Sequence, residues 1–314
     1  MLIYGLVGIF KKRQNFRKKG AYILNKQTIG FIGTGVMGSS MAHHLLKGGH
    51  PVHVYTRTKK KAESLIEEGA IWEDSVAEIA RVAEVVITII GTPKDVEDVY
   101  FGENGLIENA RPGTFLVDMT TSKPSLAVEI YERAKEKGLH ALDAPVSGGD
   151  VGARNAKLAI MVGGDEEDFE TILPIFKLMG ENIVHQGKAG AGQHTKMVNQ
   201  ISIAPAMIGL CEALVYTKKA GLDPEKVLAT ISTGAAASWN LSNYAPRMLK
   251  GDFAPGFAIK HYIKDMKIAL ESAAEMNLTT PGLELALKMY EELAAKGEGE
   301  SGIHALIKYF DEAF

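Results

Sequence analysis

The stretch TIGFIGTGVMG, residues 28–38, decides the fold. Its first five residues form a short apolar run, which is typical of a buried strand. Glycines follow at the GxGxxG spacing, and the apolar pattern of residues 37–47 predicts a helix directly after them. A bare GxGxxG is weak evidence, but a strand before it and a helix after it predict a dinucleotide-binding loop.

Each glycine of this loop has its own task. Gly33 allows a tight turn, Gly35 lets a pyrophosphate approach the backbone, and Gly38 lets the helix pack close to the strand. The helix N-terminus then presents free N–H groups to the phosphates. A strand-to-helix turn without a ligand is the alternative, but it would not need all three glycines. The residues expected to bind the cofactor here are Gly33, Thr34, Gly35, Val36, Met37 and Gly38.

Strand and helix patterns alternate from the start of this stretch to about residue 185. This alternation predicts a fold of the α/β class, with a Rossmann-type, doubly wound, mostly parallel sheet. Such a sheet binds its ligand at the carboxyl ends of the strands. Further strands are expected at 52–55, 85–90, 114–118 and 158–162, with a helical stretch near 60–67.

The pattern becomes purely helical after Gly192. We therefore expect an NAD(P)-binding Rossmann domain over 28–190 and an all-helical C-terminal domain over 191–314, which binds substrate and oligomerises. Residues 1–27 are expected to form a basic, poorly ordered extension. Helices of the second domain are expected at 193–220, 224–231, 242–249, 259–276 and 282–295.

Composition and charge exclude several classes of partner. Residues 1–27 hold seven Lys or Arg and no acid, so the rest of the chain carries 28 basic and 38 acidic residues. This acidic body argues against a nucleic-acid partner. No apolar run approaches the roughly 20 residues of a membrane-spanning helix, so no membrane partner is expected. The single cysteine, Cys211, is typical of a reducing compartment, and we expect a cytoplasmic protein.

The end of the second predicted strand bears on the choice of cofactor. An NAD enzyme usually places an acid about 20 residues after the glycine loop, but residues 54–61 read VYTRTKKK and contain none. Arg57 is placed to stack on adenine or to pair with a 2′-phosphate, with Thr56 and Thr58 as hydroxyl donors. NADP is therefore expected, with NAD as the alternative. Lys59–Lys61 are interpreted as the solvated start of a helix.

Three later segments complete a set of motifs. They read DAPVSGG at 143–149, GKAGAGQHTKMVN at 187–199 and KDMKIA at 264–269. Together with the opening GFIGTGVMG they resemble the β-hydroxyacid dehydrogenase family, which includes 3-hydroxyisobutyrate dehydrogenase, tartronate semialdehyde reductase and glyoxylate/succinic semialdehyde reductase. The resemblance runs from about Thr28 to the end, and four motifs in order are far more specific than any one alone.

The resemblance implies roles for residues that the pattern alone would leave ambiguous. Lys196 would be the catalytic residue, and Asn199, three residues later on the same helical face, would orient the substrate. An ammonium group beside the substrate oxygen can protonate a forming alkoxide, and the neutral amine can accept the proton in reverse. A lone lysine on a helix is usually just solvated, so this role depends on the neighbouring motif residues.

The same resemblance implies the rest of the site. Ser147, Gly148 and Gly149 offer a hydroxyl and unhindered N–H groups that suit a substrate carboxylate. Thr121 follows a predicted strand at the nicotinamide end and would contact both substrate and cofactor. Lys264 and Asp265 would lie by the cofactor, although an exposed charge pair on a helix is the alternative.

The expected function is hydride transfer between NADP(H) and a small β-hydroxy acid or its semialdehyde. The expected partner is a small carboxylate substrate, and the family implies a homodimer or homotetramer. No metal site is expected, because the pair His43-His44 is interpreted as solvated helix surface. The alternatives are an imine reductase-like enzyme, which usually lacks lysine at the catalytic position, and a catalytically silent NADP-binding interaction module.

Overall fold

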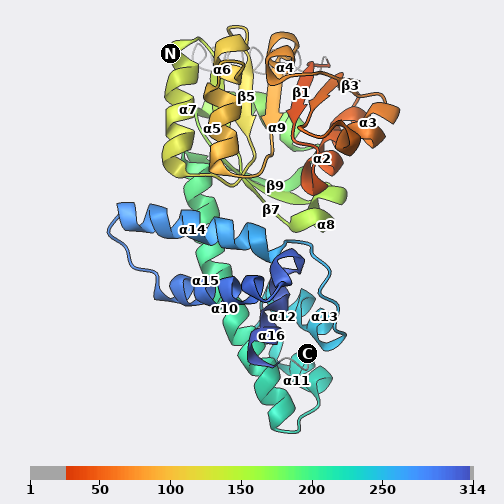
Figure 1. The fold of residues 1–314 in the computed structure, drawn as a ribbon, viewed down its shortest axis with the longest axis vertical. Helices are drawn as coiled ribbons and strands as arrows, with labels where there is room; N and C mark the ends of the chain where they lie inside the picture. The colour runs from red at the N-terminus through yellow and green to blue at the C-terminus, as the bar shows by residue number, and fades with distance from the viewer. Residues whose placement is uncertain (1–25, 312–314) are drawn as a thin grey trace, which may run out of the picture.

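The computed structural model describes residues 26–311. A sheet flanked by helices forms one end of the molecule, a group of helices forms the other, and one long helix runs between them (Figure 1). The expected α/β class with a helical C-terminal part is confirmed. The expectation for the N-terminal extension concerns residues that lie almost wholly outside the described range.

The sheet has nine strands in the described residues, and β1 lies inside it with β2 and β4 parallel on its two sides. The order is β3-β2-β1-β4-β5-β6-β8-β7, with β9 paired to β8. All pairs are parallel except β6–β8 and β7–β8. The bounds are β1 Ile29–Ile32, β2 Val52–Tyr55, β3 Ile71–Trp72, β4 Val85–Thr88, β5 Phe115–Asp118, β6 His140–Asp143, β7 Val146–Ser147, β8 Leu158–Gly163 and β9 Gly180–Gly187.

Alternate residues of β1 face opposite sides of the sheet, as strand geometry requires. Ile29 and Phe31 belong to a buried cluster with α2, α3, α8 and α9, whereas Ile32 belongs to a second cluster with α4, α5, α6 and α7. Both faces of the sheet are therefore covered. The helices are α2 Val36–Lys47, α3 Glu63–Glu67, α4 Val76–Val82, α5 Pro93–Phe101, α6 Leu106–Asn109, α7 Pro124–Glu136, α8 Gly149–Arg154 and α9 Glu166–Phe176, with the 3₁₀ turn η1 Lys59–Ala62 before α3.

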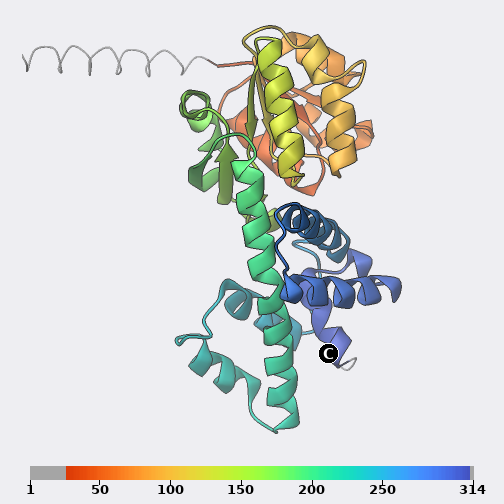
Figure 2. The same cartoon turned by 90° about the vertical axis from the view of Figure 1, so that its left-hand side faces the viewer.

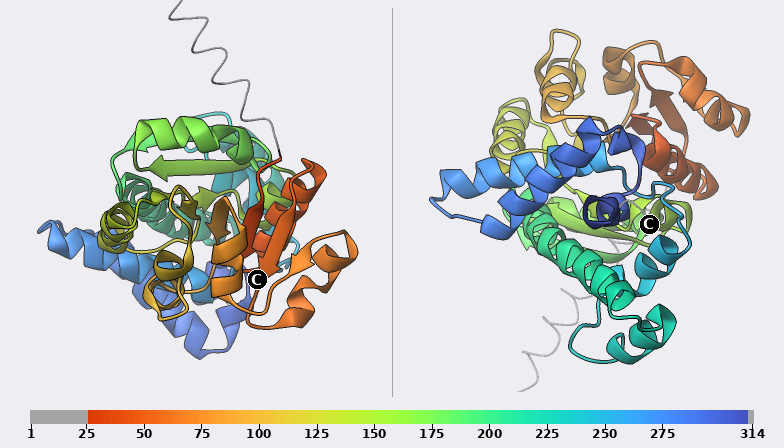
Figure 3. Two further views of the ribbon diagram at one scale, coloured as in Figure 1. Left: turned by 90° about the horizontal axis from the view of Figure 1, so that it is seen from above. Right: turned by 60° about the horizontal axis from the view of Figure 1, so that its bottom comes forward.

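The helical end is built around α10 (Ala191–Lys219), which packs against β8 and β9 near its start and against α14, α15 and α16 along its length (Figures 2 and 3). A third buried cluster joins these helices. The remaining elements are α11 Pro224–Ile231, α12 Trp239–Asn243, α13 Ala245–Leu249, α14 Ile259–Glu275, α15 Pro281–Ala295, η2 Glu298–Glu300, η3 Ile303–Leu306 and α16 Ile307–Phe310.

Two sequence expectations need correction in this half. The single helix expected over 242–249 is two short helices: Ser238 caps α12, and α13 restarts after Tyr244 with a proline in its first turn, where the missing N–H costs nothing. The helix α10 is also long and apolar enough to cross a membrane, with a mean hydropathy of 1.4. Several of its apolar side chains, among them Met207, Leu210 and Leu214, belong to the core of the helical end, and 39% of the apolar window is buried.

Candidate functional site

The glycine loop between β1 and α2 has the shape of a phosphate cradle. Gly33 has φ +100°, and a Cβ on it would lie 2.2 Å from the carbonyl oxygen of Ile89. A Cβ on Gly38 would lie 1.9 Å from the carbonyl oxygen of Gly33, so the helix needs glycine there to pack. A Cβ on Gly35 meets nothing within 4 Å, and the buried hydroxyl of Thr34 has no partner. Open backbone and an unpaired hydroxyl fit the pyrophosphate of a dinucleotide.

Lys196 lies in the second turn of α10 with only 6% of its surface exposed. Its Nζ donates a hydrogen bond of 2.9 Å to the carbonyl oxygen of Val146. Burial lowers the pKa of Lys196, and the charge of Lys264 lowers it further, while Asp265 acts in the opposite direction. A buried amine with a lowered pKa releases its proton more readily than a solvated lysine does, so it is suited to act as a general acid or base.

The segment 147–149, which is expected to bind a carboxylate, lies beside Lys196, because the bonded residue Val146 directly precedes Ser147. Ser147 ends β7, and the turn into α8 passes through Gly148 at φ +132° and Gly149 at φ +61°. The carbonyl oxygen of Gly256 packs against this turn, and a Cβ on Gly149 would lie 3.3 Å from it. The contact of the 256 segment with this turn gave no signal in the sequence.

A chain of polar contacts links Asn199 to Thr121 across the two halves of the molecule. The amide of Asn199 donates to Gln200 Oε1 at 2.7 Å, and Gln200 Nε2 donates to Asp265 Oδ2 at 2.7 Å. Asp265 also pairs with Lys264 at 3.2 Å, and Lys264 Nζ donates to the carbonyl oxygen of Thr121 at 2.9 Å. The structure thus brings together four residues selected from sequence, through Gln200, which sequence analysis missed.

Arg57 and Thr58 lie apart from this cluster. Arg57 follows β2, next to the strand that carries the glycine loop, and its side chain is 80% exposed. Its Nη1 donates to Asp95 Oδ1 at 2.9 Å, while Thr58 stands directly before η1. A cation at the carboxyl end of β2 is suited to a phosphate on the adenosine ribose of a dinucleotide that crosses the glycine loop.

Comparisons with known proteins show what the chain as a whole is similar to. Residues 28–187 match the model of the NAD-binding domain of 6-phosphogluconate dehydrogenase, and residues 190–310 match that of NADP-dependent 3-hydroxyisobutyrate dehydrogenase. The chain is 64% identical to an uncharacterized oxidoreductase of Bacillus subtilis (90% of this chain, 98% of the relative). It is 37% identical to 2-hydroxy-3-oxopropionate reductase of Escherichia coli (89% and 96%).

Among solved structures, the chain resembles 3-hydroxyisobutyrate dehydrogenase of Mycobacterium tuberculosis with L-serine. The TM-score is 0.85 at 32% identity, over 91% of this chain and 99% of that one. The chain belongs to the β-hydroxyacid dehydrogenase family. It is therefore an NAD(P)-dependent oxidoreductase that moves a hydride between a nicotinamide and a small β-hydroxy acid or its semialdehyde, as the sequence predicted.

One sequence interpretation outside the site is wrong in part for this dehydrogenase. His43 and His44 on α2 were expected to be solvated. His44 Nε2 instead lies 2.9 Å from the carbonyl oxygen of Ala153, where it joins α2 to α8, and His43 pairs with Glu68. His44 therefore contributes to the packing of α2 against α8, whereas His43 stays at the surface, with 32% of its side chain exposed.

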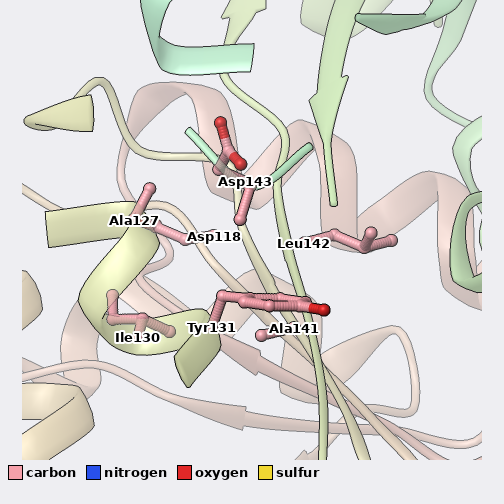
Figure 4. Close-up of a pocket in the computed structure, with 8 residues that line it drawn as sticks. Asp118, Ala127, Ile130, Tyr131, Ala141, Leu142 and Asp143 are labelled. Carbon is pink, nitrogen blue, oxygen red and sulfur yellow. The ribbon is translucent and has the colours of Figure 1, made fainter. Parts of the chain in front are cut away.

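Buried polar residues that the sequence did not select lie at the ends of β5 and β6, just before Thr121 and Ser147. Asp118 closes β5, and its Oδ1 accepts hydrogen bonds from the Thr88 hydroxyl at 2.8 Å and from the backbone N–H of Thr120 at 3.0 Å. Asp143 is its register partner on β6. Both residues line a cavity of about 10 Å³ beside α7, which has room for about one water (Figure 4).

Burial raises the pKa of Asp118 from its ordinary 3.8 to about 6. The folded protein therefore keeps this proton to a higher pH than the unfolded chain does, and the free energy of unfolding falls as pH rises from about 4 to about 6. Asp118→Asn should remove this loss and stabilise the protein at pH 7.5 by about 2 kcal/mol. Thermal unfolding at pH 7.5 and pH 4.5 tests this; a difference in Tm that is equal at both pH values would contradict it.

Proposed function

We propose that this dehydrogenase reduces a small semialdehyde acid with NADPH and that Lys196 supplies the proton. The observation that carries the proposal is the buried amine of Lys196, whose pKa is lowered and which is bonded to the carbonyl next to Ser147. The direction of reduction is favoured because cellular NADP pools serve reduction, and because an NADP preference is expected from the strand end at Arg57.

The dinucleotide supplies or accepts the hydride when it is bound. In reduction, the Lys196 ammonium transfers a proton to the carbonyl oxygen of the substrate as that oxygen gains negative charge, and the amine then takes a proton from water. In oxidation, the neutral amine accepts the proton of the alcohol. A pKa that burial brings towards neutral serves both directions, since each needs one protonation state before the step and the other after it.

The other site residues hold the substrate in this proposal. Ser147, Gly148 and Gly149 bind its carboxylate through a hydroxyl and backbone N–H groups. Asn199 and Thr121 orient the reacting carbon and oxygen, and their positions are supported by the Gln200–Asp265–Lys264 contacts. Alignment of this kind is a large part of what a protein adds to cofactor chemistry.

The preference for NADP(H) is tested at Arg57. Arg57→Ala should raise the KM for NADPH about tenfold and leave the KM for NADH nearly unchanged, because only the former carries the 2′-phosphate that a guanidinium can bind. Lys60→Ala, an exposed lysine three residues later, is the control and should change neither value. A wild-type kcat/KM that is higher with NADH than with NADPH would contradict the proposed preference for NADP(H).

The site proposal as a whole is tested by a substrate panel. NADPH oxidation is followed with methylmalonate semialdehyde, 2-hydroxy-3-oxopropionate, glyoxylate and succinic semialdehyde, and NADP⁺ reduction with 3-hydroxyisobutyrate and L-serine. Turnover of at least one C2–C4 aldehyde acid is expected. Binding of NADPH without turnover across the panel would support a silent cofactor-binding module instead.

Assembly and location belong to the same proposal. A cytoplasmic homodimer or homotetramer is supported by α11, which buries none of its residues within one chain, and by the exposed aromatic side chains of Tyr216 and Trp239. The single cysteine, Cys211, is buried as a free thiol, which suits a reducing compartment. Light scattering of the purified protein should give a mass of two or four chains, and a monomer would contradict this.

A further inference from the structure

The helix that carries Lys196 is anchored at its N-terminus by a carboxylate from another element. The residue before α10 is Gly190, which has no side chain, and the first turn holds no acidic residue. Asp143 at the end of β6 accepts the N–H of Gly190 on Oδ1 at 2.8 Å and the N–H of Gln193 on Oδ2 at 2.8 Å. Both carboxylate oxygens therefore satisfy donors that a helix start leaves open.

The start of α10 is packed closely against the ends of β6 and β8. A Cβ on Gly163 would lie 2.4 Å from Asp143 Oδ1, and a Cβ on Gly192 would lie 2.3 Å from the carbonyl oxygen of Met161. The glycines at these two positions let α10 start directly against β6 and β8. Asp143 is 4% exposed, so its two charge-assisted hydrogen bonds are made away from water, where they are strong.

The same helical turn also holds the segment 120–122, which follows β5. Gln193 is fully buried, and its Nε2 donates to the carbonyl oxygen of Thr120 at 2.7 Å, while its Oε1 accepts the N–H of Ser122 at 2.9 Å. These two backbone groups flank Thr121. Gln193 thus binds Asp143 through its backbone and the segment around Thr121 through its side chain.

We infer that Asp143 and Gln193 are positioning residues for the proton transfer by Lys196. Lys196 follows Gln193 by three residues on one rigid helix, and its acceptor Val146 follows Asp143 by three residues. The buried hydrogen bonds of Asp143 and Gln193, together called the joint below, therefore set where the amine lies relative to Ser147 and Thr121. This inference rests on the proposed role of Lys196, and misplacement of a reacting group by about 1 Å can cost about a hundredfold in rate.

Asp143→Asn tests the joint. The amide keeps the shape but presents an NH₂ group to one helix N–H, so the first turn of α10 should shift and admit water. We expect kcat for semialdehyde reduction to fall at least about tenfold with KM changed less than about threefold. The pKa seen in the pH profile of kcat should rise towards that of an ordinary lysine, because a hydrated amine is no longer disfavoured as a cation.

A matched control separates positioning from stability. Asp223 caps α11 by accepting the N–H groups of Glu225 and Lys226, and it follows the C-terminal end of α10, whereas Lys196 lies near the start of that helix. Asp223→Ala also removes a helix cap and should lower Tm, but should leave kcat and its pH profile unchanged. Equal kcat values for Asp143→Asn and wild type would overturn the inference.

A second variant and a second measurement keep the test decisive if Asp143→Asn folds poorly. Gln193→Met retains the length of the side chain but loses both bonds to the 120–122 segment, and should lower kcat in the same way. Amide hydrogen exchange at residues 190–196 and 120–122, measured without cofactor, should quicken in both variants. Turnover of Lys196→Ala separates the two proposals. If Lys196→Ala retains turnover, the proposed role of Lys196 fails. If Lys196→Ala loses turnover while Asp143→Asn and Gln193→Met keep the wild-type kcat, only the present inference fails.

Discussion

Lys196→Ala should lower kcat/KM for semialdehyde reduction by about 10²–10⁴-fold, the range that a positioned general acid contributes. Lys196 is 6% exposed and its Nζ donates to the carbonyl oxygen of Val146. A lysine at the protein surface therefore cannot supply the proton in its place. The binding of NADPH should change little, because the glycine loop lies on another element. Steady-state kinetics and fluorescence titration with NADPH measure the two quantities separately.

Lys267→Ala is the control for this substitution. Lys267 lies on α14, is 58% exposed and pairs with Glu291 at 2.7 Å, which is the ordinary situation of a surface lysine. Its replacement should leave kcat within about twofold of wild type, as surface pairs contribute little. If Lys196→Ala keeps wild-type turnover, the proton has another donor and the mechanism proposed above is wrong.

Gly35→Val should weaken NADPH binding by at least about a hundredfold while leaving Tm unchanged. The backbone of Gly35 has φ −73° and ψ −166°, which any residue adopts, and a Cβ there meets no atom within 4 Å. The added side chain therefore costs the folded protein nothing, but it occupies the space through which a pyrophosphate approaches the loop. Isothermal titration with NADPH and thermal unfolding of the free protein measure both effects.

Gly38→Ala serves as the comparison, because it should lower the Tm, which Gly35→Val leaves unchanged. Its Cβ would lie 1.9 Å from the carbonyl oxygen of Gly33, so α2 must move away from β1. A clear drop in Tm is expected even without cofactor, since overpacking of a close backbone contact destabilises the fold. A Gly35→Val protein that binds NADPH as wild type does would show that the dinucleotide does not cross this loop.

The strands and helices with strong local patterns were predicted closely. The strand at 52–55 and the helix at 224–231 have the expected bounds, because apolar periodicity and a proline or glycine boundary are local signals. The strands β3, β6, β7 and β9 were missed. Two of them have only two residues, and β9 (Gly180–Gly187) is polar and half-exposed, so only pairing with β8 makes it a strand.

In the candidate site, too, local sequence motifs were found and contacts between distant residues were missed. Of the residues taken from motifs, Asn199, Asp265, Lys264 and Thr121 are linked by polar contacts, but polar groups that support this arrangement were missed: Gln193, Gln200, Asp118 and Asp143. Gln193 contacts Thr120, which is 73 residues away, and Gln200 contacts Asp265, which is 65 residues away. Hydrogen bonds over such separations have no local pattern, because they depend on which strand ends become neighbours in the sheet.

The amino-acid sequence by itself determined the α/β fold, the glycine loop for a dinucleotide and the family, because periodicity and glycine spacing act within a few residues of the chain. Only the tertiary structure decided that Lys196 is buried, that its pKa is lowered, and that its helix begins on the carboxylate of Asp143. The physical reason is that desolvation and charge are properties of the space around a group, and that space is formed here by residues 146, 196 and 265 together.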